Sequence, residues 1–112
     1  MNPGELYWAE LASGRRPVIV VSRSQFNLGT YVTIVPLTTS RLSERSSLPN
    51  CILLPKGRFG ISKTCVAQAD QIAVIDSVRL RPPAIGKLDF DSHRSLINAI
   101  GYVLNANCEL AY

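Results

Sequence analysis

Two arginines and a run of hydroxyl side chains flank two neighbouring segments that we expect to form β-strands. They are Arg15 and Arg16 before the first segment, and Thr38, Thr39 and Ser40 after the second. Residues 18–21 and 31–35 are apolar and β-branched, with turn chemistry at residues 27–29. An antiparallel pair would therefore bring a guanidinium beside the hydroxyls at one end of the sheet. A planar guanidinium matches two phosphate oxygens and keeps its charge at any relevant pH.

The same residue types have a simpler interpretation. Arg16 beside Pro17 also fits a solvated surface arginine. A threonine at the end of a strand often satisfies the backbone of the following loop. Without further motifs, the residue types favour the solvated arginine.

The composition is that of an ordinary globular protein. Apolar residues make up 46% of the 112 residues and charged residues 18%, and this length predicts one domain over residues 1–112. No apolar run is long enough to span a bilayer, and the first residues do not join a basic segment to an apolar one. We therefore expect a cytoplasmic protein without a membrane partner.

The formal net charge of +4 favours an anionic partner, and nucleic acid before others. Six of the twelve basic residues fall between Arg15 and Lys56, which concentrates the charge in one part of the chain. A mild basic excess is equally typical of a solvated surface, so both interpretations stay open.

The cysteines are odd in number and far apart: Cys51, Cys65 and Cys108. This spacing offers neither a zinc site nor a disulfide framework. We expect buried, reduced thiols and neither a metal nor another cofactor.

The elements that position the arginines and hydroxyls are predicted to be mostly strands. Besides 18–21 and 31–35, the expected strands are residues 5–11, 51–54, 64–75 with a break near Asp70, and 85–88. Trp8 is expected in the core, and residues 41–47 are predicted to be an exposed, mobile loop.

The end of the chain is predicted to be helical. Asp76 is expected to cap a short turn through Arg79, and Asp89 to cap a helix reaching Asn105 with apolar residues at helical spacing. The fold class is therefore mainly β, a small barrel-like antiparallel sheet with a C-terminal helix packed on it.

Four short motifs in order resemble the MazF/PemK (Kid) family of bacterial toxins. They are GELYWAEL at residues 4–11, RPVIVVS at 16–22, VPLT at 35–38 and ADQI at 69–72. The resemblance covers nearly the whole chain and includes residues 79–80 and 86–88 before the final helix. It implies an SH3-like barrel, a homodimer and a cognate antitoxin that holds the toxin inactive. It also implies sequence-specific, metal-independent cleavage of single-stranded RNA.

The resemblance also implies roles for individual residues. Metal-free cleavage uses the 2′-hydroxyl of the RNA, and it needs proton transfer and stabilisation of the phosphorane. Arg16 is expected to stabilise charge, Thr38 matches the catalytic threonine, and Asp70 matches the acid/base aspartate of the Kid branch. Pairing of Asp70 with an arginine is an equal alternative. The residues expected to contact RNA are Arg15, Thr39, Ser40, Arg41, Arg45, Gln68 and Gln71.

His93 is the only histidine, on the apolar side of the predicted helix. We expect it to pack or to make a hydrogen bond on the helix surface. A mechanism that needs two histidines is impossible in one such chain.

The sequence departs from the family in two places. The link at residues 12–15 is short where many members carry a longer loop that helps to hold RNA, and Ala73 stands at a usual arginine position. A decayed, non-catalytic barrel that binds RNA is therefore one alternative. A gyrase-poisoning toxin of the CcdB type is another, although residues 108–112 lack the tryptophan pair that would insert into a partner.

Overall fold

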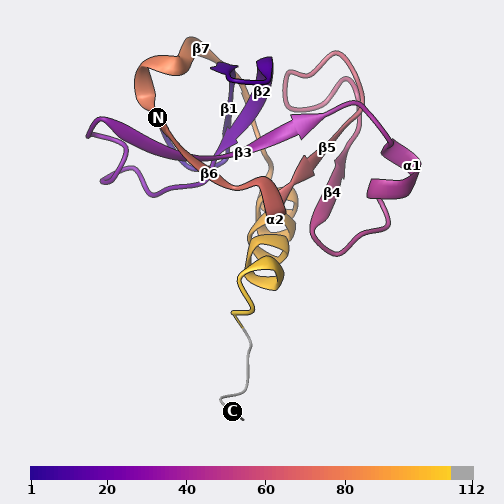
Figure 1. Ribbon diagram of the computed structural model, residues 1–112. Helices are drawn as coiled ribbons and strands as arrows, with labels where there is room; N and C mark the ends of the chain where they lie inside the picture. Colours follow the sequence, from indigo (N-terminus) through magenta and orange to yellow (C-terminus); the bar gives the residue numbers. More distant parts are fainter. Residues whose placement is uncertain (107–112) are drawn as a thin grey trace.

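The computed structural model describes residues 1–106, which form a bent antiparallel sheet and a C-terminal helix (Figure 1). The strands are β1 (Glu5–Leu11), β2 (Gly14–Val20), β3 (Tyr31–Thr38), β4 (Cys51–Leu54), β5 (Cys65–Gln68), β6 (Ala73–Asp76) and β7 (Leu80–Lys87). The α-helices are α1 (Leu42–Arg45) and α2 (Phe90–Val103), and single 3₁₀ turns span Ala69–Gln71 and Ser77–Arg79. The predicted mainly β fold with a C-terminal helix is confirmed.

The central strand is β3, which pairs with β2 along one edge and with both β6 and β5 along the other. The hydrogen-bonded path runs β4-β5-β3-β2-β1-β7, with β6 pairing β3 beside it. Within residues 1–106 this path ends at β4 and β7, so the barrel-like sheet is not closed. The break predicted near Asp70 is the 3₁₀ turn between β5 and β6.

The central strands are apolar on both faces because each face meets its own core. Ile19 and Val35 belong to a cluster with Leu96 of α2, whereas Val18 and Ile34 belong to a second cluster on the opposite face. Strands covered on both faces read as continuous apolar runs rather than alternating ones. Each fully buried aliphatic side chain stabilises the fold by about 1.5–3 kcal/mol.

Two elements differ from the sequence prediction. The expected loop at residues 41–47 contains α1, one helical turn in which the amide of Ser46 donates to the carbonyl of Leu42. A single turn is too short to show a helical period. Strand β7 begins at Leu80 rather than at residue 85, and it includes Pro82 and Pro83. Prolines are tolerated there because β7 is an edge strand, whose one partner among the described strands is β1.

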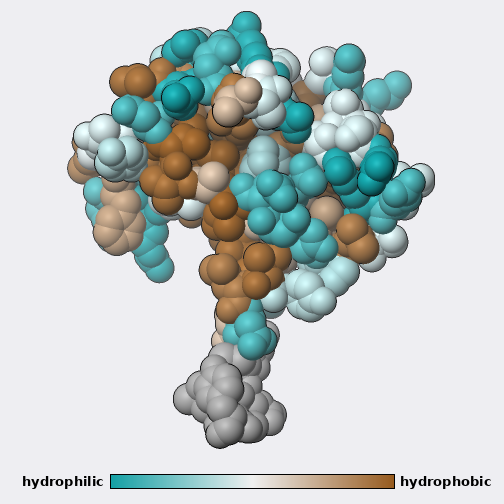
Figure 2. Space-filling model, viewed as in Figure 1, coloured by the Kyte–Doolittle hydropathy of each residue, from teal (hydrophilic) through white to brown (hydrophobic). Residues whose placement is uncertain are grey.

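Helix α2 begins as predicted, since the carboxylate of Asp89 accepts a hydrogen bond from the Ser92 amide at 2.8 Å. Leu96 and Ala99 are buried against the sheet. Phe90, Ile97 and Leu104 stay 77%, 46% and 63% exposed, so the sheet covers only part of the apolar face. Figure 2 shows this apolar surface along the helix. No helix in the described part of the chain is long and apolar enough to cross a membrane.

Three smaller predictions concern side chains. The cap on the short turn is confirmed, because the Asp76 carboxylate accepts from the Val78 amide at 3.0 Å. Cys51 and Cys65 are buried and free as expected, while Cys108 lies outside the described residues. His93 packs against Gly4, where an added Cβ would lie 3.3 Å from its Nδ1.

Candidate active site

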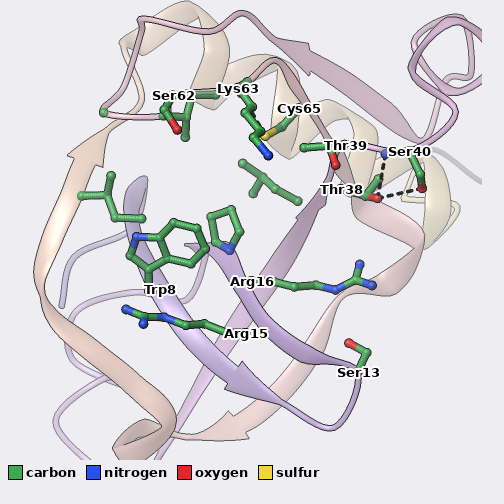
Figure 3. A pocket seen from close by; sticks show the side chains of 15 residues that line it. Trp8, Ser13, Arg15, Arg16, Thr38, Thr39, Ser40, Ser62, Lys63 and Cys65 are labelled. Atoms are coloured by element: carbon green, nitrogen blue, oxygen red, sulfur yellow. Dashed lines mark hydrogen bonds between the residues drawn. The ribbon is translucent and has the colours of Figure 1, made fainter.

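A cavity of about 640 Å³ opens where β2 begins and β3 ends (Figure 3). Its volume lies in the range of about 300–1,000 Å³ that is typical of ligand sites. Five residues singled out from the sequence line it: Arg15, Arg16, Thr38, Thr39 and Ser40. The predicted meeting of arginines and hydroxyls at one end of the sheet is therefore confirmed, while their chemical roles remain predictions.

The sheet register explains why Arg16 meets Thr38. Val18 and Pro36 form the outermost pair of the β2–β3 ladder, and Arg16 and Thr38 each lie two residues beyond that pair, at the same end of the sheet. Residues opposite each other in an antiparallel pair carry their side chains on the same face. Figure 3 shows the Arg16 guanidinium between Ser13 and Thr38. Arg16 is half-buried, and within residues 1–106 it has no ion-pair or hydrogen-bond partner, so its donors are available.

The Thr38 hydroxyl belongs to a small hydrogen-bond network. Its Oγ1 lies 3.1 Å from Ser40 Oγ and accepts from the Ser40 amide at 3.3 Å. Arg45, from α1, donates through Nη1 to the Oγ and the carbonyl of Ser40 at 3.2 and 3.3 Å. Thr38 is only 8% exposed, and this network fixes its side chain at the cavity edge.

Trp8 lines the cavity, so its predicted core position is wrong. It is 40% exposed, and its ring centroid lies 5.2 Å from the Arg15 guanidinium carbon. Leu6, two residues earlier on the same face of β1, is fully buried. The core therefore ends between these two residues, and the indole extends beyond it. An aromatic residue among basic ones is typical of nucleic-acid surfaces. No such signal was visible at Trp8 in the sequence, because its charged neighbours along the chain are Glu5 and Glu10.

The far wall of the cavity was missed by the sequence analysis. Ser62 and Lys63 come from the segment before β5, and Figure 3 shows the Lys63 ammonium directed into the cavity. Gly60 and Gly86 hold this segment against β7, because a Cβ on either would lie 2.1 Å from a backbone oxygen of the other segment. No local pattern predicts this contact, since the two segments are far apart in sequence.

Buried Cys65 also lines this wall. Burial raises the pKa of its thiol, and the nearby Lys63 charge partly opposes that rise. The thiol is therefore kept in its protonated form, and we assign it a packing role.

A second cavity of about 420 Å³ lies on the other side of Arg16. Arg16 and Ser13 line both cavities. The remaining lining residues are apolar or amide side chains: Leu11, Ala12, Ile34, Pro36, Gln68, Gln71, Ala73 and Ile75. The structure thus brings Gln68 and Gln71 to Arg16, and Ala73 leaves open space where a longer side chain would stand.

Three predicted site residues line neither cavity: Asp70, Arg41 and Arg45, the last of which contacts Ser40 from α1. Asp70 is exposed and accepts from the amides of Asn50 and Gln71 at 2.7 and 3.3 Å, so neither Arg16 nor another arginine of the described chain pairs with it. Arg41 is exposed at the start of α1. Within residues 1–106, no three His, Cys, Asp or Glu side chains group closely enough to hold a metal ion.

Comparisons with known proteins show which sequences and folds this chain is similar to. A curated relative, the endoribonuclease MazF of Staphylococcus saprophyticus, is 26% identical over 88 residues, which are 72% of each chain. An endoribonuclease solved with its cognate antitoxin from a mycobacterial species shares the fold at a TM-score of 0.79, with 22% identity over 94% of this chain and 95% of that one. The MazE–MazF structure (form II) from Deinococcus radiodurans has a TM-score of 0.73 and 25% identity, over 93% and 94%.

The family model of the PemK-like, MazF-like toxin of type II toxin–antitoxin systems matches residues 2–104. This match spans both cavities and every element of the described sheet. The chain therefore belongs to the PemK/MazF family of toxins of type II toxin–antitoxin systems.

Proposed function

We propose that this toxin is a sequence-specific, metal-independent endoribonuclease that cleaves single-stranded RNA. The observation that carries the proposal is that the free guanidinium of Arg16 and the hydroxyl of Thr38 line the same cavity. A relative carries the name endoribonuclease, which supports the same reaction class. The planar donors of Arg16 suit two phosphate oxygens, and Thr38 supplies a third donor to the same group.

The reaction is an attack of the 2′-oxygen on the adjacent phosphorus. The bond to the 5′-oxygen breaks, which leaves a 2′,3′-cyclic phosphate and a 5′-hydroxyl. The 2′-hydroxyl loses its proton and the departing 5′-oxygen gains one. Arg16 stabilises the charge of the phosphorane and stands where it can also donate a proton, while Thr38 positions the phosphate.

The two cavities would hold neighbouring parts of the RNA. In the first, the exposed indole of Trp8 offers a stacking surface, and Arg15 and Lys63 attract the backbone. In the second, Gln68 and Gln71 present amides beside apolar walls, which suits a nucleobase with flat apolar faces and a hydrogen-bonding edge.

The test is cleavage of single-stranded RNA in EDTA by the purified protein. We expect products with cyclic phosphate ends, and no cleavage when the 2′-hydroxyl at the scissile position is replaced by hydrogen. Binding without cleavage would favour the decayed RNA-binding barrel. Inhibition of gyrase without cleavage would favour the CcdB-type function.

We also propose an antitoxin with an acidic, disordered segment that folds over the arginine-rich end of the sheet. Basic residues gather there from β2, α1 and the segment before β5: Arg15, Arg16, Arg41, Arg45 and Lys63. Such a segment loses conformational entropy on binding, but it can cover a large surface. Expression of the toxin alone should arrest growth, and co-expression of the partner should restore it.

A homodimer is the third part of the proposal. The exposed apolar side chains of Phe90 and Ile97 in α2 and of Leu104 just after it support this assembly, because an apolar surface of this kind commonly lies at an interface. Sedimentation at micromolar concentration should show a dimer, and a pure monomer would contradict the assembly.

A further inference from the structure

We infer that Arg45 is a positioning residue for cleavage, acting on the scissile phosphate through Ser40 and Thr38. The inference rests on the proposed function, because it concerns how Thr38 presents its hydroxyl to the phosphate. Three hydrogen-bonding distances form a chain from α1 to the cavity: 3.2 Å from Arg45 Nη1 to Ser40 Oγ, 3.1 Å from Ser40 Oγ to Thr38 Oγ1, and 3.3 Å from the Ser40 amide to Thr38 Oγ1.

The direction of this chain follows from what its two ends can do. A guanidinium only donates hydrogen bonds, and a phosphate diester at neutral pH only accepts them. The hydroxyls between them must therefore point the same way, with Arg45 donating to Ser40, Ser40 to Thr38, and Thr38 to the phosphate. With the opposite orientation, the oxygen of Thr38 would face the phosphate without a proton.

The acceptor count at Thr38 agrees with this direction. A hydroxyl has two lone pairs and one proton. The Ser40 amide occupies one lone pair of Thr38 Oγ1, and with the Ser40 hydroxyl donating to the other, the Thr38 proton is left for the cavity. A donor chain of this kind also polarises its members, which strengthens the last hydrogen bond.

The position of Arg45 separates it from the other arginines at this end of the sheet. Its Nη1 donates to both the carbonyl and the hydroxyl of Ser40. The Arg45 residue is partly buried on α1. Arg41, four residues earlier, is exposed and donates no side-chain hydrogen bond within the described chain. Arg41 is therefore suited to attract the RNA backbone, whereas Arg45 orients a hydroxyl.

The test is single-turnover cleavage in EDTA with saturating protein, combined with a separate RNA-binding titration. Arg45→Met and Ser40→Ala should each lower the saturated rate about tenfold while the Kd for RNA changes little. The double variant should be no slower than the slower single variant, because both changes break one chain. Ser40→Thr keeps the hydroxyl and should restore most of the rate.

Two further arginine variants serve as comparison. Arg94→Met removes the same charge from an exposed position on α2 and should match the wild type. Arg41→Met should weaken binding instead of slowing the saturated step. Thermal melting checks the fold of each variant, and Ser40→Ala, which breaks the same hydrogen-bond chain, carries the test if Arg45→Met does not fold.

Several results would overturn the inference. Three results would contradict the role of Arg45 but not the proposed nuclease activity. They are a full saturated rate in Arg45→Met, an effect on Kd alone as for Arg41→Met, and additive losses in the double variant. A wild-type protein that cleaves no RNA would contradict both the proposed function and the role of Arg45.

Discussion

The two cavities on either side of Arg16 differ in what their walls can do. The first is lined by charged, hydroxyl and aromatic side chains, including Arg15, Lys63 and Trp8, together with apolar ones such as Leu37 and Ile61. The second is lined by apolar side chains and by the amides of Gln68 and Gln71. Charges and hydroxyls stabilise a reacting phosphate, whereas amides beside apolar walls discriminate between bases. Substitutions in the first cavity should therefore change the cleavage rate, whereas substitutions in the second should change which RNA sites are cleaved. Arg16 lies at the boundary between the two cavities.

The largest effect is expected at the boundary itself. Arg16→Ala and Thr38→Ala should each lower kcat by roughly 10²- to 10³-fold, or about 3–4 kcal/mol, because each removes one preorganised donor. RNA affinity should change far less, and losses in the double variant should be less than additive because both residues serve one phosphate. Single-turnover cleavage in EDTA measures both quantities.

His93→Ala is the matched control for these variants. His93 lines neither cavity and packs against Gly4, so its loss should leave the rate nearly unchanged and lower stability instead. Full activity in Arg16→Ala, or abolished activity in a folded His93→Ala, would contradict the placement of the reaction centre at the first cavity.

The next effect concerns binding in the first cavity. Trp8→Ala should weaken RNA binding by about 1–3 kcal/mol, because it removes a stacking surface, while the saturated rate changes little. Trp8→Phe should keep most of the affinity. Trp8 is the only tryptophan, so its fluorescence reports binding directly in the wild type. RNA that binds without any change in this fluorescence would place the bases elsewhere.

A smaller effect is expected in the second cavity. Gln68→Ala or Gln71→Ala should each change the relative rates at different cleavage sites by about fivefold, the size of one lost hydrogen bond. The summed cleavage rate should remain closer to the wild type than in either boundary variant. Sequencing the 5′ ends of the products measures this preference, and an unchanged set of sites in both variants would remove the base-reading role.

The smallest effect lies outside both cavities, at the start of α2. The Ser92 amide and the neighbouring Arg58 charge hold the pKa of the Asp89 carboxyl below its usual value. A depressed pKa means that this contribution to stability is present above the unfolded pKa and is lost as pH falls through the folded one. Asp89→Asn should therefore flatten the acid side of the stability profile while cleavage is unchanged. Urea unfolding at several pH values measures it, and identical profiles would contradict the cap's charge dependence.

The sequence by itself determined the central hairpin and the residues at its end. The apolar runs of β2 and β3 and the turn between them set the pairing, and the pairing brings Arg16 and Thr38 to the same end of the sheet. The capping residues Asp76 and Asp89 were also predictable, because each acts within three residues of its own position. Local interactions of this kind can be predicted from the sequence because the interacting groups are close in the chain.

Tertiary structure alone decided the surroundings of that hairpin. Lys63 reaches the cavity because Gly60 and Gly86 let two distant segments meet closely. Trp8 is exposed because on its face of β1 the core ends at Leu6, although a large aromatic residue in a strand is usually buried. Arg45 reaches Ser40 through a helical turn too short to show a period. Each case depends on where the ends of elements lie in space, which residue types and spacing along one chain do not specify.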